Sequence, residues 1–98
     1  MNLIDFVGKI SESCNTQVSE LVSEYYDQIT SLYHTITHLP DNILEDIGTS
    51  EITEEYFCIP LLIKKDTNID EVLKQLEEST DSISFSIDKK QNCINCKL

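Results

Sequence analysis

The feature that most constrains the fold of this chain is an apolar pattern with helical spacing that extends over its first 39 residues. Steps of three and four residues lead from Ile4 to Leu39, and eight of the eleven positions on this path are apolar or aromatic. No proline precedes Pro40, and the only glycine in the stretch is Gly8. The pattern therefore predicts one amphipathic helix over residues 3–38, which ends at Pro40 because the residue before a proline avoids the α conformation.

A continuous helix of this length would span roughly 50 Å at about 1.5 Å per residue. A compact domain of 98 residues has a radius of gyration of only about 12–13 Å, so the apolar side of such a helix would need cover from partner helices. The residues predicted to form this interface are Ile4, Val7, Cys14, Val18, Leu21, Val22, Tyr25, Ile29, Leu32, Ile36 and Leu39. The weakest part of the predicted helix is 11–16, where short polar side chains can bond their own backbone and divide it into two helices.

Aromatic residues add to the surface of this segment. Tyr25, Tyr26 and Tyr33 combine an apolar ring with a polar hydroxyl, a type of side chain that is common in the centre of protein interfaces. The same residues serve equally well as core packing under a helix. The sequence leaves both roles open.

After Pro40 the pattern changes, and residues 1–98 together predict a single α+β domain. Its three predicted parts are a helical assembly segment (1–39), an acidic connector (40–55) and a small α/β unit (56–98). In the connector, Ile43, Leu44 and Ile47 fall on one side of a short helix predicted over 42–47, with Gly48 as its stop.

The α/β unit is predicted to contain a strand, a helix and a second strand. The apolar run 56–63 predicts a strand covered on both faces, with Pro60 at an edge, a bulge or a break in the ladder. A capping pattern at Asn68 opens a helix over 69–78, and isoleucine and phenylalanine alternate with serine in a strand over 82–88. Because two strands alone are marginal, a third is expected from 49–55, the C-terminal tail or another molecule.

The formal net charge of −11 is distributed unevenly along the chain. Residues 1–63 contain eleven acidic side chains against Lys9 alone, whereas residues 64–98 contain seven against six lysines. This acidity and the absence of arginine predict no nucleic-acid binding, because a phosphate backbone would be repelled. The charge favours either solubility or the docking of a basic partner.

No run of residues approaches the ~20 apolar positions that a membrane-spanning helix needs, and no signal peptide pattern precedes the first helix. The expected location is intracellular, cytoplasmic or nuclear, where thiols stay mostly reduced. The final tripeptide Cys96-Lys97-Leu98 shares its small, basic and leucine order with the S-K-L peroxisomal address, a match of three residues only.

Four side chains form the one metal-ligand pattern in the sequence. His34 and His38 are one helical turn apart, and Cys93 and Cys96 form a C-x-x-C pair, so the set matches the ligands of a tetrahedral Cys2His2 zinc site. The alternative is that the histidines interact with the negative end of the helix dipole and that the cysteines lie in a frayed tail. No other cofactor is indicated.

No arrangement in the sequence points to catalysis. A nucleophile beside a base is not apparent, and with only Gly8 and Gly48 there is no glycine loop to bind phosphate. The sequence therefore predicts a non-catalytic assembly or scaffold subunit that joins partner helices, in a homo- or hetero-oligomer, through its N-terminal helix. The alternatives are an acidic chaperone or inhibitor that masks a basic or apolar surface of a client protein, and a zinc-stabilised interaction module.

Overall fold

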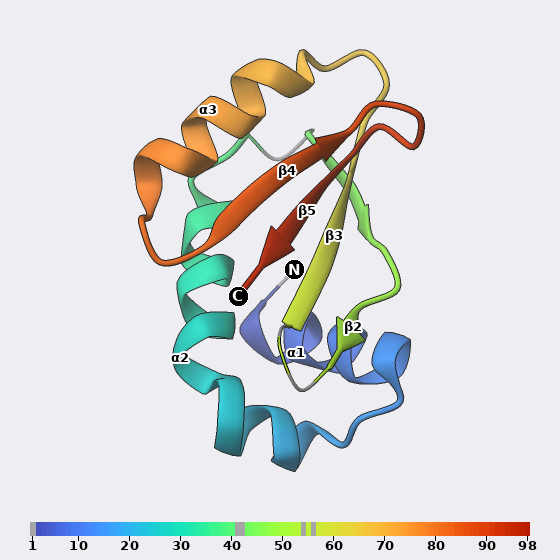
Figure 1. Cartoon of the computed structure of the whole chain (residues 1–98), viewed down its shortest axis with the longest axis vertical. Coiled ribbons are helices and arrows are strands. Elements are labelled where there is room, and N and C mark those ends of the chain that lie inside the picture. Colours follow the sequence, from blue (N-terminus) through green and yellow to red (C-terminus); the bar gives the residue numbers. More distant parts are fainter. Residues whose placement is uncertain (1, 41–42, 54, 56) are drawn as a thin grey trace.

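The protein is described by a computed structural model that covers residues 2–40, 43–53, 55 and 57–98. Figure 1 shows two helices at the N-terminal end of the chain, followed by strands that are interrupted by a third helix. The bounds of these elements are α1 Leu3–Cys14, α2 Val18–Thr37, β1 Leu44–Ile47, β2 Glu51–Ile52, β3 Phe57–Ile63, α3 Ile69–Ser79, β4 Ser84–Asp88 and β5 Cys93–Lys97. The predicted α+β fold is confirmed.

The single helix predicted over residues 3–38 is corrected by the structure, which contains two helices that pack against each other. The first ends at Cys14, and Asn15 follows in the left-handed conformation with φ of 54°. The N–H of Asn15 donates to the carbonyl of Ser11, which closes the end of α1. Asparagine adopts this backbone conformation more readily than most residues, so the chain reverses inside the stretch 11–16 that the sequence marks as weakest.

The helix hairpin conceals most of its apolar surface within the chain. The rings of Phe6 in α1 and Tyr33 in α2 have centroids 5.7 Å apart. On α2, Leu21, Ile29 and Leu32 are at most 2% exposed, because the hairpin lies against the sheet. None of the described helices combines the length and the apolarity needed to cross a bilayer.

The strands form an antiparallel sheet in the order β1-β3-β5-β4, with β2 also paired to β3. Strand β5 lies between β3 and β4, so the C-terminal tail supplies the strand that the sequence requires. The strands predicted over 56–63 and 82–88 are β3 and β4, and the helix predicted over 69–78 is α3. Asn68 caps α3, as predicted, by accepting hydrogen bonds from the N–H groups of Asp70 and Glu71.

The short helix predicted over 42–47 is wrong. Residues 41 and 42 lie outside the described part, and Leu44–Ile47 is strand β1, which pairs with β3. A six-residue helix is marginal by itself, whereas the open edge of β3 offers a ladder of hydrogen bonds. Gly48 does not serve as a helix stop: its N–H donates to the carbonyl of Pro60 at 2.9 Å, and a Cβ at Gly48 would lie 2.9 Å from the Pro60 ring.

The strand 56–63 is predicted to be covered on both faces, and in the structure, which describes it from residue 57 onward, the two faces are covered to different degrees. Exposure alternates along β3, and its buried side chains belong to the cluster that the helices cover: Phe57, Ile59, Leu61 and Ile63. The intervening Cys58, Pro60 and Leu62 are half-buried and lie outside that cluster. A strand with this pattern has one face on the core and the other face turned away from the helices.

Pro60 sits where the ladder is interrupted, as the sequence predicts. At the two ends of β5, the N–H of Leu98 donates to the carbonyl of Phe57 and the N–H of Ile63 donates to the carbonyl of Asn92. The bonding direction alternates along a strand, so the nitrogen of Pro60 faces the opposite edge of β3. On that edge β1 pairs with the second half of β3 and β2 with its start. The missing N–H of the proline therefore falls between the two short strands.

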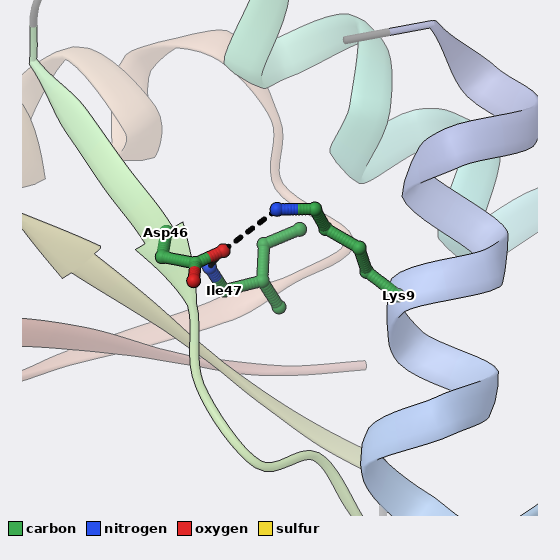
Figure 2. Close-up of polar contacts among 3 residues, drawn as sticks. All are labelled: Lys9, Asp46 and Ile47. Carbon is green, nitrogen blue, oxygen red and sulfur yellow. Dashed lines mark hydrogen bonds and ion pairs between the residues drawn. The ribbon is translucent and has the colours of Figure 1, made fainter.

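An ion pair connects α1 to β1 (Figure 2). The Nζ of Lys9 lies 2.8 Å from Oδ1 of Asp46, and the N–H of Ile47 donates to the same oxygen at 2.8 Å. The hydrogen bond from Lys9 and that from the Ile47 N–H both lower the pKa of Asp46. Because the two side chains are 46% and 52% exposed, we expect the pair to contribute less than about 1 kcal/mol.

Replacement of Leu21 by alanine tests whether the hairpin buries its own apolar side. Leu21 is fully buried, so Leu21→Ala is expected to lower the free energy of unfolding by about 2–5 kcal/mol, measured by chemical denaturation. Its neighbour Val22 is the matched control: it is 43% exposed, and Val22→Ala should change stability by less than about 1 kcal/mol. Equal losses for both variants would contradict the described packing.

The ion pair predicts a small pH dependence of stability. Since the pKa of Asp46 is lower in the folded state, its contribution is present above the ordinary value of 3.8 and is lost as the pH falls through the folded value. Lys9→Met should therefore be less stable than the wild type near neutral pH, by less than about 1 kcal/mol. The difference, measured by denaturant titration at several pH values, should shrink below pH 3.8. A gap that widens in acid would refute this role for the pair.

Candidate interaction surface

The structure divides the eleven predicted interface residues into two groups. Eight lie in the core of the chain or pack against it: Val7, Cys14, Leu21, Tyr25, Ile29, Leu32, Ile36 and Leu39. The three that stay exposed are Ile4, Val18 and Val22. Most of the predicted interface is therefore internal, and only part of it is available to another molecule.

Val18, Val22 and Tyr26 form an exposed apolar row on the N-terminal half of α2, called here the α2 stripe. Their exposed fractions are 46%, 43% and 49%. Val18 and Val22 are four residues apart and share one side of the helix, and Tyr26 follows the irregular Tyr25 on the same half of α2. Tyr26 is absent from the predicted interface, although the sequence marks it as part of the aromatic surface of the helix.

A local distortion of α2 separates the stripe from the core. Tyr25 has non-helical backbone angles, φ −125° and ψ 15°, inside the helix. Its ring contacts that of Phe57 edge-on, with centroids 4.8 Å apart, so Tyr25 is held against the sheet while Tyr26 faces outward. In Figure 1 the N-terminal half of α2 lies beyond the lower end of the sheet.

The surroundings of the stripe are acidic. Glu20, Glu24 and Asp27 are exposed on the same half of α2, and no lysine, arginine or histidine occurs between residues 10 and 33. Lys9, the one cation before residue 64, is paired with Asp46 on another part of the surface. An apolar row in a negative field is complementary to a partner surface that has an apolar centre and a basic border.

The four predicted zinc ligands lie on different parts of the fold. His34 and His38 are exposed at the C-terminal end of α2, whereas Cys93 and Cys96 belong to β5. Side chains three residues apart in a strand point to opposite faces: Cys96 lies in the helix-covered core, and Cys93 is buried outside it. Among the residues that the structure describes, no three potential ligands come together.

The alternative that these cysteines lie in a frayed tail is wrong, because β5 is a central strand of the sheet. Cys96 and Lys97 are part of it, and the N–H of Leu98 donates to the carbonyl of Phe57 at 2.8 Å. The tripeptide that resembles a peroxisomal address is thus engaged in backbone pairing in this fold.

Burial also determines the chemistry of the thiols. It is the main cause that raises the pKa of Cys58, Cys93 and Cys96, and the rise is largest for Cys96. The thiolate is the reactive form of cysteine, so a raised pKa makes these groups poor nucleophiles at neutral pH. Cys93 and Cys96 are buried, whereas Cys58 is half-buried.

Thiol labelling tests this arrangement of the cysteines. With a water-soluble alkylating reagent at neutral pH, we expect Cys14 and Cys58, which are half-buried, to react before Cys93 and Cys96. Cys96 should be modified only as the protein unfolds, as read by mass spectrometry of peptides with and without denaturant. Rapid labelling of Cys96 in the folded protein would contradict its position on the covered face of β5.

Within the described residues, three of the four large hydrophobic side chains that are exposed belong to one half of α2. A contiguous group of exposed apolar side chains is a candidate surface for binding another protein. The α2 stripe is therefore the candidate functional site. Comparison of the chain with protein-family models, curated proteins and solved structures finds no match.

Proposed function

We propose that this protein is a non-catalytic assembly subunit that binds a partner protein through the α2 stripe. The observation that carries the proposal is the exposure of Val18, Val22 and Tyr26 on a helix whose Leu21, Ile29 and Leu32 are buried in the core. The proposed interface is smaller than the one predicted from the sequence, because the hairpin buries most of the predicted interface residues within the chain.

Charge indicates the chemistry of the partner. Two copies of this surface would bring Glu20, Glu24 and Asp27 of each chain together, which opposes self-association at this site. A different protein with an apolar groove or helix bordered by lysine and arginine would meet both the stripe and its acidic surroundings. We therefore assign the stripe to a heterotypic contact.

The size of the stripe limits how the partner binds. A specific interface buries about 800 Å² on each partner, more than three partly exposed side chains supply. The contact must extend over the polar surface around the stripe, with the apolar residues as its centre. In such interfaces a few central residues contribute most of the binding free energy.

The alternative function is an acidic chaperone or inhibitor, and the excess of acidic residues in positions 1–63 favours it. That function would depend mainly on charge, so binding should weaken steeply between low and high salt. Docking through the stripe should lose much less affinity over the same range. A zinc-stabilised module is the third hypothesis, and metal analysis of protein purified without chelators tests it directly.

A single charge introduced into the stripe tests the proposal. The tagged wild type is used to isolate a partner from its native source, and binding is then measured with the purified partner. Val22→Asp should weaken the affinity about tenfold or more, which corresponds to at least 1.4 kcal/mol. The matched control is Ser23→Asp, which adds the same charge at the next exposed position, outside the stripe.

Circular dichroism and denaturation of both variants show whether the fold is retained. The proposal fails if Val22→Asp binds the purified partner as tightly as the wild type. It also fails if Ser23→Asp loses as much affinity as Val22→Asp, since binding would then depend on total charge and not on the stripe.

A further inference from the structure

We propose that the outer edge of β4 pairs with β4 of a second copy of this chain, antiparallel, so that two sheets join into one. This surface is on another element than the α2 stripe, and the inference does not depend on the proposed function. It follows from the bonding direction of the strands, the side chains along the edge and the charges at the two ends of β4.

The backbone of β4 has unpaired groups on its outer edge. Strand β5 bonds to β3 through its even-numbered residues, as the hydrogen bonds of Asn92 and Leu98 show, so its odd-numbered residues bond to β4. Their partners in β4 are Ser84, Ser86 and Asp88. The N–H and C=O groups of Phe85 and Ile87 therefore point outward, and no described strand pairs with that edge.

The two edges of the sheet differ in how they are protected. Strand β1 has four residues, a register irregularity between Leu44 and Asp46, and an exposed Glu45, all of which discourage pairing with another chain. Strand β4 has five residues, Ser-Phe-Ser-Ile-Asp, in regular register, without proline, glycine or lysine. A hollow of about 330 Å³ lies between the end of α3 and the start of β4, with Glu77 and Phe85 in its lining.

The side chains of β4 select one register. The antiparallel pairing that overlaps all five residues places Ser86 opposite Ser86 of the second copy and Phe85 opposite Ile87. Phe85 and Ile87 are half-buried and pack against the core on the helix-covered face, so the pairing would complete their burial. An aromatic residue opposite a β-branched one is a favourable cross-strand pair.

Charges at the two ends of β4 favour a second copy of this chain as the partner of its outer edge. The exposed Asp81 precedes the strand, and the exposed Lys89 and Lys90 follow it, so antiparallel pairing brings the acidic end of one copy to the basic end of the other. The same edge lies in residues 64–98, where seven acids are nearly balanced by six lysines. The large negative charge of the N-terminal part is then a weaker obstacle here than at the α2 stripe.

Substitution of Ser86, which would lie opposite Ser86 of the second copy on the two-fold axis of the dimer, tests the proposal. The wild type should sediment at twice the chain mass of 11.2 kDa at high concentration, in a reversible equilibrium. Ser86→Lys places like charges opposite each other and should weaken the dimer at least about tenfold. The matched control Ser84→Lys adds the same charge at another exposed position, but opposite Asp88 of the second copy, and should retain the dimer.

Cross-linking gives a second readout that does not depend on weakening the dimer. In a background with Cys14→Ser and Cys58→Ser, oxidised Ser86→Cys should form a covalent dimer, because the two residues face each other. Ser84→Cys should not, since the two copies of residue 84 are offset by four positions, roughly 13 Å along the strands.

Three results would overturn the inference: a wild type that stays monomeric at high concentration, a dimer that Ser86→Lys leaves intact, or equal cross-linking of the two cysteine variants. Val22→Asp separates this contact from the proposed function, because it should leave the dimer unchanged. A dimer lost in Val22→Asp and kept in Ser86→Lys would assign self-association to the α2 stripe. If the protein stays monomeric and binds an extended peptide along the outer edge of β4, this edge would be a binding site for a different protein.

Discussion

The fold depends on the burial of one side of the α1–α2 hairpin against a single face of the sheet. A chain of 98 residues can form only a small hydrophobic core. The chain reverses at Asn15, and Leu21, Ile29 and Leu32 of α2 are buried in this core. The sheet meets this demand with one apolar face, formed by alternate residues of β3 together with Ile94 and Cys96 of β5. A chain without the reversal would leave the hairpin surface, and this face of the sheet, exposed to water.

The same packing decides which surfaces stay available for binding. Core formation uses the inner side of α2 and the helix-covered face of the sheet, so Val18, Val22 and Tyr26 remain exposed on the outer side of α2, and the outer edge of β4 is left without a strand among the described residues. These two surfaces have different electrostatic settings. The α2 stripe lies among acidic residues that repel a second copy, whereas β4 lies in the part of the chain where opposite charges nearly balance. The proposed heterotypic and homotypic contacts follow from that difference.

Local patterns were sufficient to predict α3, β3 and β4. The cap at Asn68 and the alternation around Phe85 are signals that tertiary contacts reinforce. The sequence marks 11–16 as the weakest part of the helix, but a continuous helix and a hairpin differ mainly in long-range contacts. The sequence predicts a helix where β1 forms because the local spacing of Ile43, Leu44 and Ile47 fits a helix and carries no sign of the pairing with β3. Tyr26 is absent from the predicted interface because the heptad pattern selects the side of the helix that turns to the core, and Tyr26 lies outside that pattern.

The most direct test of this account is a nuclear Overhauser measurement between the aromatic rings of Phe6 and Tyr33. In the hairpin their centroids are 5.7 Å apart, whereas one continuous helix would hold them roughly 40 Å apart at about 1.5 Å per residue. Mixed samples of isotope-labelled and unlabelled protein distinguish contacts within one molecule from contacts between molecules. We expect a ring-to-ring contact within one molecule. Its absence, together with uninterrupted helical contacts through residues 15–17, would contradict the account.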